Sequence, residues 1–130
     1  MGSLKVKAQI VCGDAVAMGP GKADLLDAIA QHGSISAAGR AMGMSYRRAW
    51  LLVDEMNRCF RCKLVTTKAS HGGGAFLTAD GEQVLNAYRL LQETVVGAAA
   101  GSGALAALTT GLREEPLALG PLGKAQPPEA

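Results

Sequence analysis

Residues 33–60, GSISAAGRAMGMSYRRAWLLVDEMNRCF, predict two helices joined by a tight turn. Ser34 is suited to begin the first helix, because a serine hydroxyl can accept a hydrogen bond from a free backbone N–H. Gly43 favours the end of that helix, since glycine adopts a positive φ without strain. Ser45 can cap the second helix in the same way as Ser34. Two helices joined by a short turn that contains glycine are typical of the helix-turn-helix motif, whose second helix enters the major groove of DNA.

The second helix is expected to have one buried and one exposed face. Apolar residues at spacings of three and four predict the buried face: Ala49, Leu52, Val53 and Met56. Two arginines in the first turn oppose the helix dipole, which disfavours cations there by about 0.3–1 kcal/mol each. A phosphate or a guanine reverses that penalty, because arginine can pair with guanine O6 and N7. We therefore favour a DNA contact over a solvated surface, and we assign to the major groove Ser45, Tyr46, Arg47 and Arg48.

The composition fits one ordinary domain followed by a tail. The chain has 130 residues, of which 48% are apolar and 4% aromatic, and its formal net charge is only +2. Whole-chain charge thus does not indicate nucleic acid, whereas the excess of Lys and Arg between residues 40 and 68 favours one basic face. The sequence contains neither a signal peptide nor an apolar run of roughly twenty residues, so we expect a cytoplasmic protein with no membrane partner.

The residues before the motif predict a strand, a short returning strand and a helix. Leu4–Val11 alternates apolar and polar residues, which indicates a strand with one buried face. After a turn at Gly13, the returning strand is expected at residues 15–18, and residues 19–21 are expected to break regular structure. The helix is expected from Lys22 to His32, with Asp24 in its first turn, where the dipole favours a carboxylate.

The residues after the motif predict a hairpin with a glycine-rich tip. The strands are expected at residues 64–68 and 75–78. A hairpin that directly follows a recognition helix is the wing of a winged helix, although a plain surface hairpin is the alternative. Glycines let backbone N–H groups approach phosphates closely, so we assign to the DNA backbone or minor groove Lys68, His71, Gly72, Gly73 and Gly74. Trp50 is expected in the core or at the flank of the wing rather than stacked on a base.

A long helix and a tail are expected to complete the chain. Thr78 can cap a helix from Ala79 to about Val96, whose apolar stripe exceeds what so small a domain can cover, so we expect a homodimer. The predicted domains are therefore residues 1–98, a winged helix-turn-helix, and residues 99–130, a flexible tail rich in Ala, Gly and Pro with a brief helix at residues 104–112. The predicted fold class is α+β, with an N-terminal strand, a β-hairpin wing and a long C-terminal helix.

Other chemistries have weaker support in the sequence. No arrangement of a nucleophile and a base, no P-loop and no dinucleotide fingerprint indicates an enzyme or a cofactor. Cys59 and Cys62 form a single pair, whereas a zinc site requires four ligands, so no metal is predicted. A thiol- or metal-responsive regulator remains an alternative, because the cations Arg58, Arg61 and Lys63 are expected to lower a thiol pKa. A protein–protein adaptor that reuses a winged helix is the other alternative.

Residues 4–95 resemble the N-terminal domain of the molybdate-responsive ModE regulators. The resemblance rests mainly on GSIS-x-A-x(2)-AMGMSYRRAW-x(2)-VDEMN, from Gly33 to Asn57. It implies a winged helix, a dimer formed through this domain and binding to inverted-repeat operators, with the recognition helix at Ser45–Phe60 and the wing at Lys68–Phe76. The residues after Gly97 show no counterpart of the family's oxyanion-binding domains, so this chain alone is expected not to bind molybdate. A separate oxyanion-binding partner is the corresponding expectation.

Overall fold

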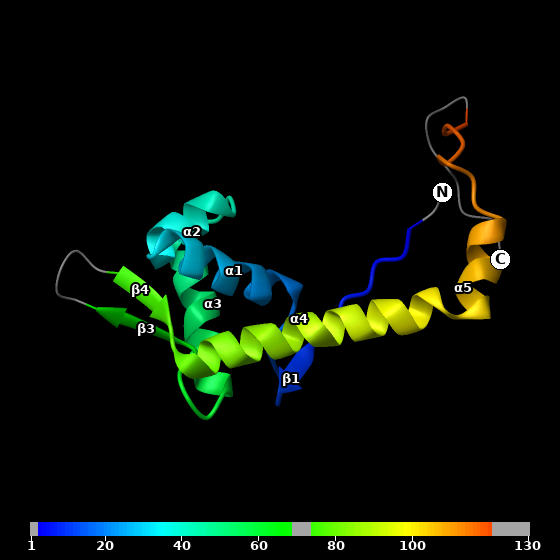
Figure 1. The fold of residues 1–130 in the computed structure, drawn as a ribbon. Helices are drawn as coiled ribbons and strands as arrows, with labels where there is room; N and C mark the ends of the chain where they lie inside the picture. Colours follow the sequence, from blue (N-terminus) through cyan, green and yellow to red (C-terminus); the bar gives the residue numbers. More distant parts are fainter. Residues whose placement is uncertain (1–2, 69–73, 121–130) are drawn as a thin grey trace.

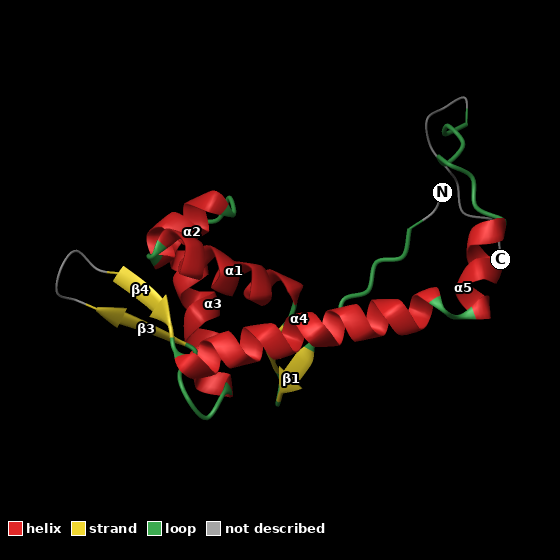
Figure 2. Ribbon diagram, in the orientation of Figure 1, coloured by secondary structure: helices red, strands yellow, loops and turns green. Residues whose placement is uncertain are grey.

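The computed structural model describes residues 3–68 and 74–120 (Figures 1 and 2). Its elements, in chain order, are β1 (Ile10–Cys12), β2 (Ala15–Met18), α1 (Pro20–His32), α2 (Ile35–Ala41), α3 (Tyr46–Cys59), β3 (Val65–Lys68), β4 (Gly74–Leu77), α4 (Ala79–Ala100) and α5 (Gly103–Thr110). Helices α1, α2 and α3 form a cluster, the hairpin β3–β4 projects from one end of it, and α4 runs past the cluster in the other direction (Figure 1). The predicted winged helix-turn-helix is confirmed.

The N-terminal strand is much shorter than expected. Alternation predicts a strand over Leu4–Val11, but β1 covers only Ile10–Cys12 and pairs antiparallel with β2. The short β2 offers too few partners to extend the ladder, and residues 3–9 are extended without strand pairing in the described part of the chain. The Tyr88 hydroxyl of α4 instead donates to the Ala8 carbonyl at 2.6 Å. The predicted turn is present, with Gly13 at φ 59°.

Helix α1 begins two residues earlier than expected. Pro20 occupies its first turn, where a missing N–H costs nothing, so the expectation that residues 19–21 break regular structure is wrong for Pro20 and Gly21. This shift moves Asp24 out of the first turn, and its carboxylate pairs with Arg89 of α4 at 2.8 Å. Gly33 ends the helix in the left-handed region, as predicted.

The motif helices begin where the caps predict. Ser34 Oγ accepts from the Ala37 N–H at 3.0 Å, and Ser45 Oγ accepts from the Arg48 N–H at 3.1 Å. Between them Gly43 adopts φ 71°. Gly39 of α2 lies so close to α3 that a Cβ added there would be 3.2 Å from the Cβ of Ala49. The motif is therefore held by caps at both helix starts and by close packing at the crossing.

The wing strands are anchored to the helices. β3 and β4 pair antiparallel, from Val65 opposite Leu77 to Lys68 opposite Gly74. The Ala75 N–H donates to the Gly33 carbonyl at 2.9 Å, which ties β4 to the end of α1. Residues 69–73, and with them the predicted wing contacts His71, Gly72 and Gly73, lie outside the described residues.

Helix α4 crosses the expected domain boundary. Thr78 caps it by accepting from the Gly81 N–H at 2.9 Å, and the helix continues to Ala100 rather than ending near Val96. Its buried residues, Gly81, Leu85 and Tyr88, all lie in its first half. The second half extends beyond the other helices, and the short helix α5 follows it (Figure 1).

One apolar core joins the helices to both hairpins. The residues with the least exposed large side chains are Met18, Leu25, Leu26, Ile29, Met56 and Leu64. The buried face of α3 contains three of the four predicted residues, whereas Leu52 is only partly buried. No helix among the described residues has the length and apolar character needed to cross a lipid bilayer.

Candidate nucleic-acid interface

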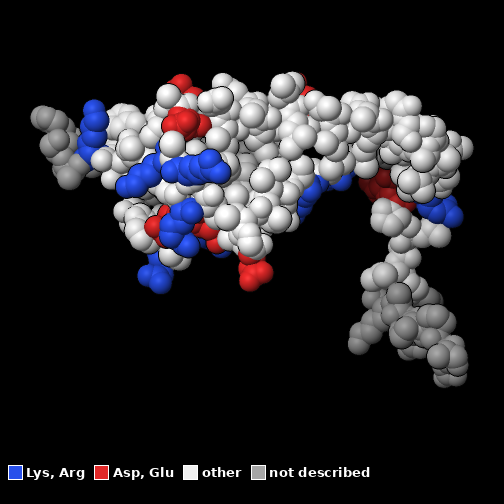
Figure 3. Space-filling view, turned by 90° about the horizontal axis from the view of Figure 1, so that it is seen from below, with Lys and Arg blue, Asp and Glu red and all other residues white. Residues whose placement is uncertain are grey.

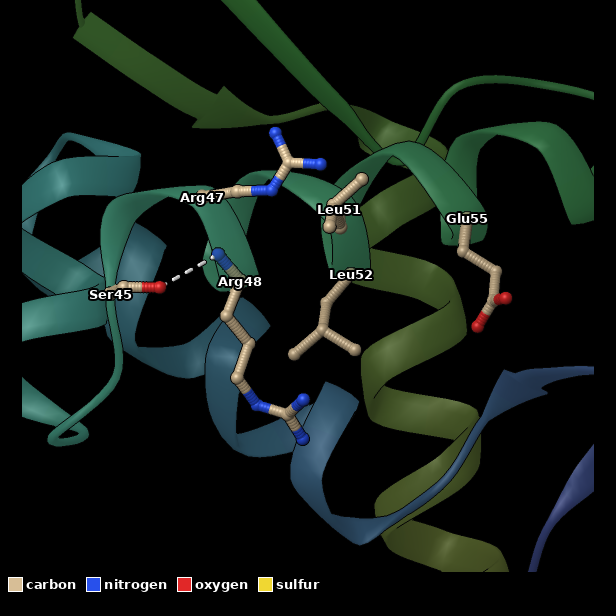
Figure 4. Close-up of a pocket in the computed structure, with 6 residues that line it drawn as sticks. All are labelled: Ser45, Arg47, Arg48, Leu51, Leu52 and Glu55. Atoms are coloured by element: carbon tan, nitrogen blue, oxygen red, sulfur yellow. Dashed lines mark hydrogen bonds between the residues drawn. The ribbon is translucent and has the colours of Figure 1, made fainter.

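Helix α3 presents three different surfaces besides its buried face. Arg47 and Leu51, one turn apart, are both exposed, and Leu51 is 45% exposed. Tyr46 and Trp50 line a groove on the side of the wing, whereas Arg48 and Leu52 line one on the side of α1. Figure 4 shows the two arginines pointing to opposite sides of the helix, with the Ser45 hydroxyl bonded to the Arg48 backbone. The four residues predicted for the major groove thus lie on one helix end but face different directions.

The groove between α3 and the wing has a volume of about 290 Å³. Its lining combines hydroxyls, aromatic rings and a lysine from α2, α3, β3 and β4: Ser34, Ile35, Ser36, Tyr46, Trp50, Thr67, Lys68 and Ala75. The Lys68 ammonium lies 5.4 Å from the centroid of the exposed Phe76 ring, within cation–π range, on the face of the hairpin opposite Thr67 and Ala75. Hydroxyl and ammonium donors are the groups that proteins use on phosphate oxygens. This groove can therefore hold a nucleic-acid backbone.

Trp50 is not a core residue. Its side chain is 45% exposed, so the expectation of a core tryptophan is wrong. The position follows from helix geometry, because Trp50 is offset from the buried residues Ala49 and Val53 toward β3. The other expectation for this residue, a place at the flank of the wing, is confirmed by the groove that Trp50 shares with Thr66 and Thr67 of β3.

Asn57 links the recognition helix to the wing. Its side-chain oxygen accepts from the backbone N–H groups of Leu64 and Val65 at 2.8 and 3.2 Å. Its amide nitrogen donates to the Val65 carbonyl at 3.0 Å. A single side chain therefore satisfies three backbone groups at the start of β3 and fixes the orientation of the wing relative to α3.

An ion pair fixes α3 to α1 behind the exposed arginines. Lys22 is 6% exposed and donates both to the Glu55 carboxylate and to the Val16 carbonyl. The hydrogen bond and charge of Lys22 lower the pKa of Glu55 below its ordinary value. Since Lys22 and Glu55 neutralise each other, Arg47 and Arg48 contribute positive charge at the start of α3 that no carboxylate of the described residues pairs.

The charged surface is asymmetric. In the view of Figure 3, Lys and Arg gather toward the end with the wing, with acidic residues among them, and the surface toward α5 is mostly uncharged apart from one mixed group. On α3 itself Arg58 is paired with Asp54 at 2.9 Å, an exposed i,i+4 pair. Among the cations of α3, this pairing leaves Arg47 and Arg48 at the start of the helix for a polyanion.

Cys59 is not an activated thiol. Burial raises the pKa of the Cys59 thiol, and a neighbouring Cys12 thiol raises it further. The expectation that nearby cations lower a thiol pKa is therefore wrong for Cys59, because desolvation dominates. In residues 3–68 and 74–120, no three His, Cys, Asp or Glu side chains are grouped to hold a metal ion.

The sequence did not assign three residues to this interface: Ser36, Leu51 and Thr67. The helical period could have found Leu51, since it lies one turn after Arg47. Ser36 and Thr67 reach the groove only through the packing of α2 and β3 beside α3, which no local pattern indicates.

Comparison with known proteins shows that the sequence of this domain is similar to those of bacterial regulators. Residues 22–82 match the family described as bacterial regulatory helix-turn-helix protein, lysR family. The molybdenum-pterin-binding protein MopB of Rhodobacter capsulatus is 42% identical over 80 residues, which are 60% of this chain and 30% of that protein. The DNA-binding transcriptional dual regulator ModE of Escherichia coli K12 is 40% identical over 76 residues, 57% of this chain and 29% of that regulator.

The matched region is the part of the chain that folds as the winged helix. The chain spans only about 30% of the length of these relatives. The family match covers α1 to the start of α4 and so includes both capped motif helices and the wing. This chain therefore carries a helix-turn-helix domain of the bacterial regulatory type, and that domain is ModE-like.

Proposed function

We propose that this chain is a transcription regulator that binds double-stranded DNA through α3 and the wing. The observation that carries the proposal is the exposed start of α3, where two unpaired arginines follow a capped turn beside a groove lined with phosphate-binding groups. A helix-turn-helix places that end of its second helix in the major groove. The same proposal makes the chain a regulator rather than an enzyme, and a cytoplasmic one.

The DNA-contacting residues divide into two sets. Ser45, Tyr46, Arg47 and Arg48 meet the major groove, and the outward position of Arg47 makes it the base-reading arginine. Arg48 points toward α1, where it shares a groove of about 360 Å³ with Lys7, and this position suits a contact with phosphates at the edge of the major groove. Lys68 and Gly74, with His71, Gly72 and Gly73 at the wing tip, contact the backbone or the minor groove.

The proposed active form is a homodimer that reads an inverted repeat. An apolar groove of about 220 Å³ lies between the N-terminal hairpin and α4 and is lined by Ile10, Met18, Phe60, Val84, Ala87, Tyr88 and Leu91. Outside this groove, Leu90 and Val96 of α4 are 64% and 45% exposed. Exposed apolar surface of this kind is typical of protein contacts, and a two-fold dimer places two recognition helices on symmetric half-sites.

The regulated genes are proposed to concern molybdenum or oxyanion metabolism. The support is the naming of the relatives, which include a molybdenum-pterin-binding protein and ModE regulators. An oxyanion signal would reach this chain through a separate binding protein.

Fluorescence anisotropy with labelled genomic fragments over a salt series tests DNA binding. The logarithm of the affinity is expected to fall linearly with the logarithm of the salt concentration, because binding releases counterions from phosphates. The double substitution Arg47→Ala and Arg48→Ala should abolish most of that binding, whereas Arg113→Ala, on the segment after α5, serves as the matched control. Absent or salt-independent binding would refute the proposal and favour a protein–protein adaptor.

Sedimentation of Leu91→Glu tests the dimer, since a charge in the apolar groove should yield monomers.

A further inference from the structure

The start of α3 carries large apolar side chains that the core does not use. Tyr46 is 56% exposed, and Trp50 and Leu51 are each 45% exposed. The buried face of the helix is complete without them, since Ala49, Val53 and Met56 are the residues that enter the core. Single exposed apolar residues are common, but these three lie within the first six residues of one helix, on the end proposed to enter DNA.

Their surroundings indicate what covers them. Arg47 and Arg48 flank the group on the helix, and Lys68 lies across the groove that Tyr46 and Trp50 line. A protein core would require these cations to be desolvated without partners. The major groove of DNA suits the mixture, because phosphates and guanine accept from cations and the C5 methyl of thymine is an apolar group on the groove floor.

Leu51 has the position to meet such a methyl group. It lies one helical turn beyond Arg47 on the outward face of α3, on the side of the pocket shown in Figure 4. One turn advances about 5.4 Å along the helix, whereas successive bases of a DNA strand are about 3.4 Å apart. Arg47 and Leu51 are therefore placed to contact different bases, one or two base pairs apart along the DNA, rather than the same base.

We infer that Leu51 is a specificity-determining residue that contacts the C5 methyl group of a thymine next to the base read by Arg47. The inference rests on the proposed DNA-binding function and adds a substrate feature to it. Tyr46 and Trp50 extend the apolar surface toward the wing and exclude water from the contact. Arg47 donates a charge-assisted hydrogen bond to its base, and Leu51 distinguishes thymine from the other bases by burying the C5 methyl group.

The test removes single methyl groups from DNA. The tightest duplex selected by the full chain from a random-sequence library is resynthesised with one thymine at a time replaced by deoxyuridine, which keeps base pairing and removes only the methyl. Burial of one methyl group corresponds to an expected loss of about three- to fivefold in affinity at one or two positions. Leu51→Ala should bind the thymine duplex three- to fivefold more weakly and should show no further loss with uracil at those positions.

A matched variant separates this contact from a general effect. Leu108→Ala removes an equally large and more exposed side chain from α5, and it should retain the full sensitivity to uracil. Melting curves of the two variants check that both remain folded. Binding that is equal for thymine and uracil duplexes, or uracil sensitivity that persists in Leu51→Ala, overturns the inference while the proposed function stands. Failure to select any duplex overturns both.

Discussion

Replacing Gly81 with alanine tests how closely α4 packs on the residues before β3. A Cβ added at Gly81 would lie 2.1 Å from the carbonyl oxygen of Leu64, a backbone atom that cannot rotate away. Relief of that overlap requires a shift of roughly 1 Å at the start of α4. The shift weakens two hydrogen bonds, from the Thr78 N–H to Leu64 at 2.9 Å and from the Thr78 hydroxyl to Lys63 at 2.6 Å.

The expected loss follows from these contacts. Overpacking and the weakened bonds cost about 2–4 kcal/mol, and the better helix propensity of alanine returns about 1 kcal/mol. The free energy of unfolding should therefore fall by about 1–3 kcal/mol. Gly97→Ala is the matched control in the same helix, because no atom lies within 4 Å of its added Cβ. That variant should gain about 0.5–1 kcal/mol.

Urea denaturation followed by circular dichroism measures both variants under one set of conditions. The two midpoints should move in opposite directions with unchanged slopes, which indicates a change of stability rather than of the unfolded state. If Gly81→Ala is as stable as Gly97→Ala, the close approach of α4 to Leu64 is wrong.

The remaining predictions concern the residues that link α3 to its neighbours, Glu55 and Asn57, and the proposed DNA contacts. Glu55→Gln should lower the free energy of unfolding by about 1–3 kcal/mol at pH 7, because buried Lys22 loses its carboxylate partner. The Lys22 hydrogen bond holds the pKa of Glu55 below its ordinary 4.5. The difference in free energy of unfolding between the wild type and Glu55→Gln should therefore be fully present above about pH 5 and should disappear as the pH falls through the lowered pKa. Urea titrations across this pH range measure that difference. Asn57→Ala should cost about 1–3 kcal/mol in the same assay because three backbone partners are released; an unchanged midpoint would contradict the link between α3 and β3. Arg47→Ala should cost about 1–3 kcal/mol at a selected duplex but little on scrambled DNA, whereas Lys68→Ala should weaken both alike; equal losses for Arg47→Ala on the two DNAs would make it a phosphate contact.

Local signals predicted the helix-turn-helix and the wing because their causes lie within a few residues. Ser34, Ser45 and Thr78 each bond a backbone N–H three residues ahead, and Gly33 and Gly43 each supply a positive φ. Such effects depend on residue type and spacing, both of which the sequence displays.

Other features depend on partners that are distant in the sequence. The length of β1 is set by β2, the burial of Lys22 by Glu55 on α3, and the exposure of Trp50 by the place of β3. The alternation in Leu4–Val11 and the size of the Trp50 side chain each indicate only that burial would be favourable. Whether another element packs there to bury them is decided by tertiary structure, which these local patterns do not show.

The three hydrogen bonds of Asn57 also bear on whether the protein or the DNA must change shape when the two bind. They set the separation between the recognition helix and the root of the wing in the free protein, so association does not have to order these two elements relative to each other. The widths of DNA grooves and the ease of bending vary with base sequence. For a DNA reader with a fixed separation between its two contacts, the deformation energy falls on the DNA, and base pairs that the protein never touches then contribute to its choice of target.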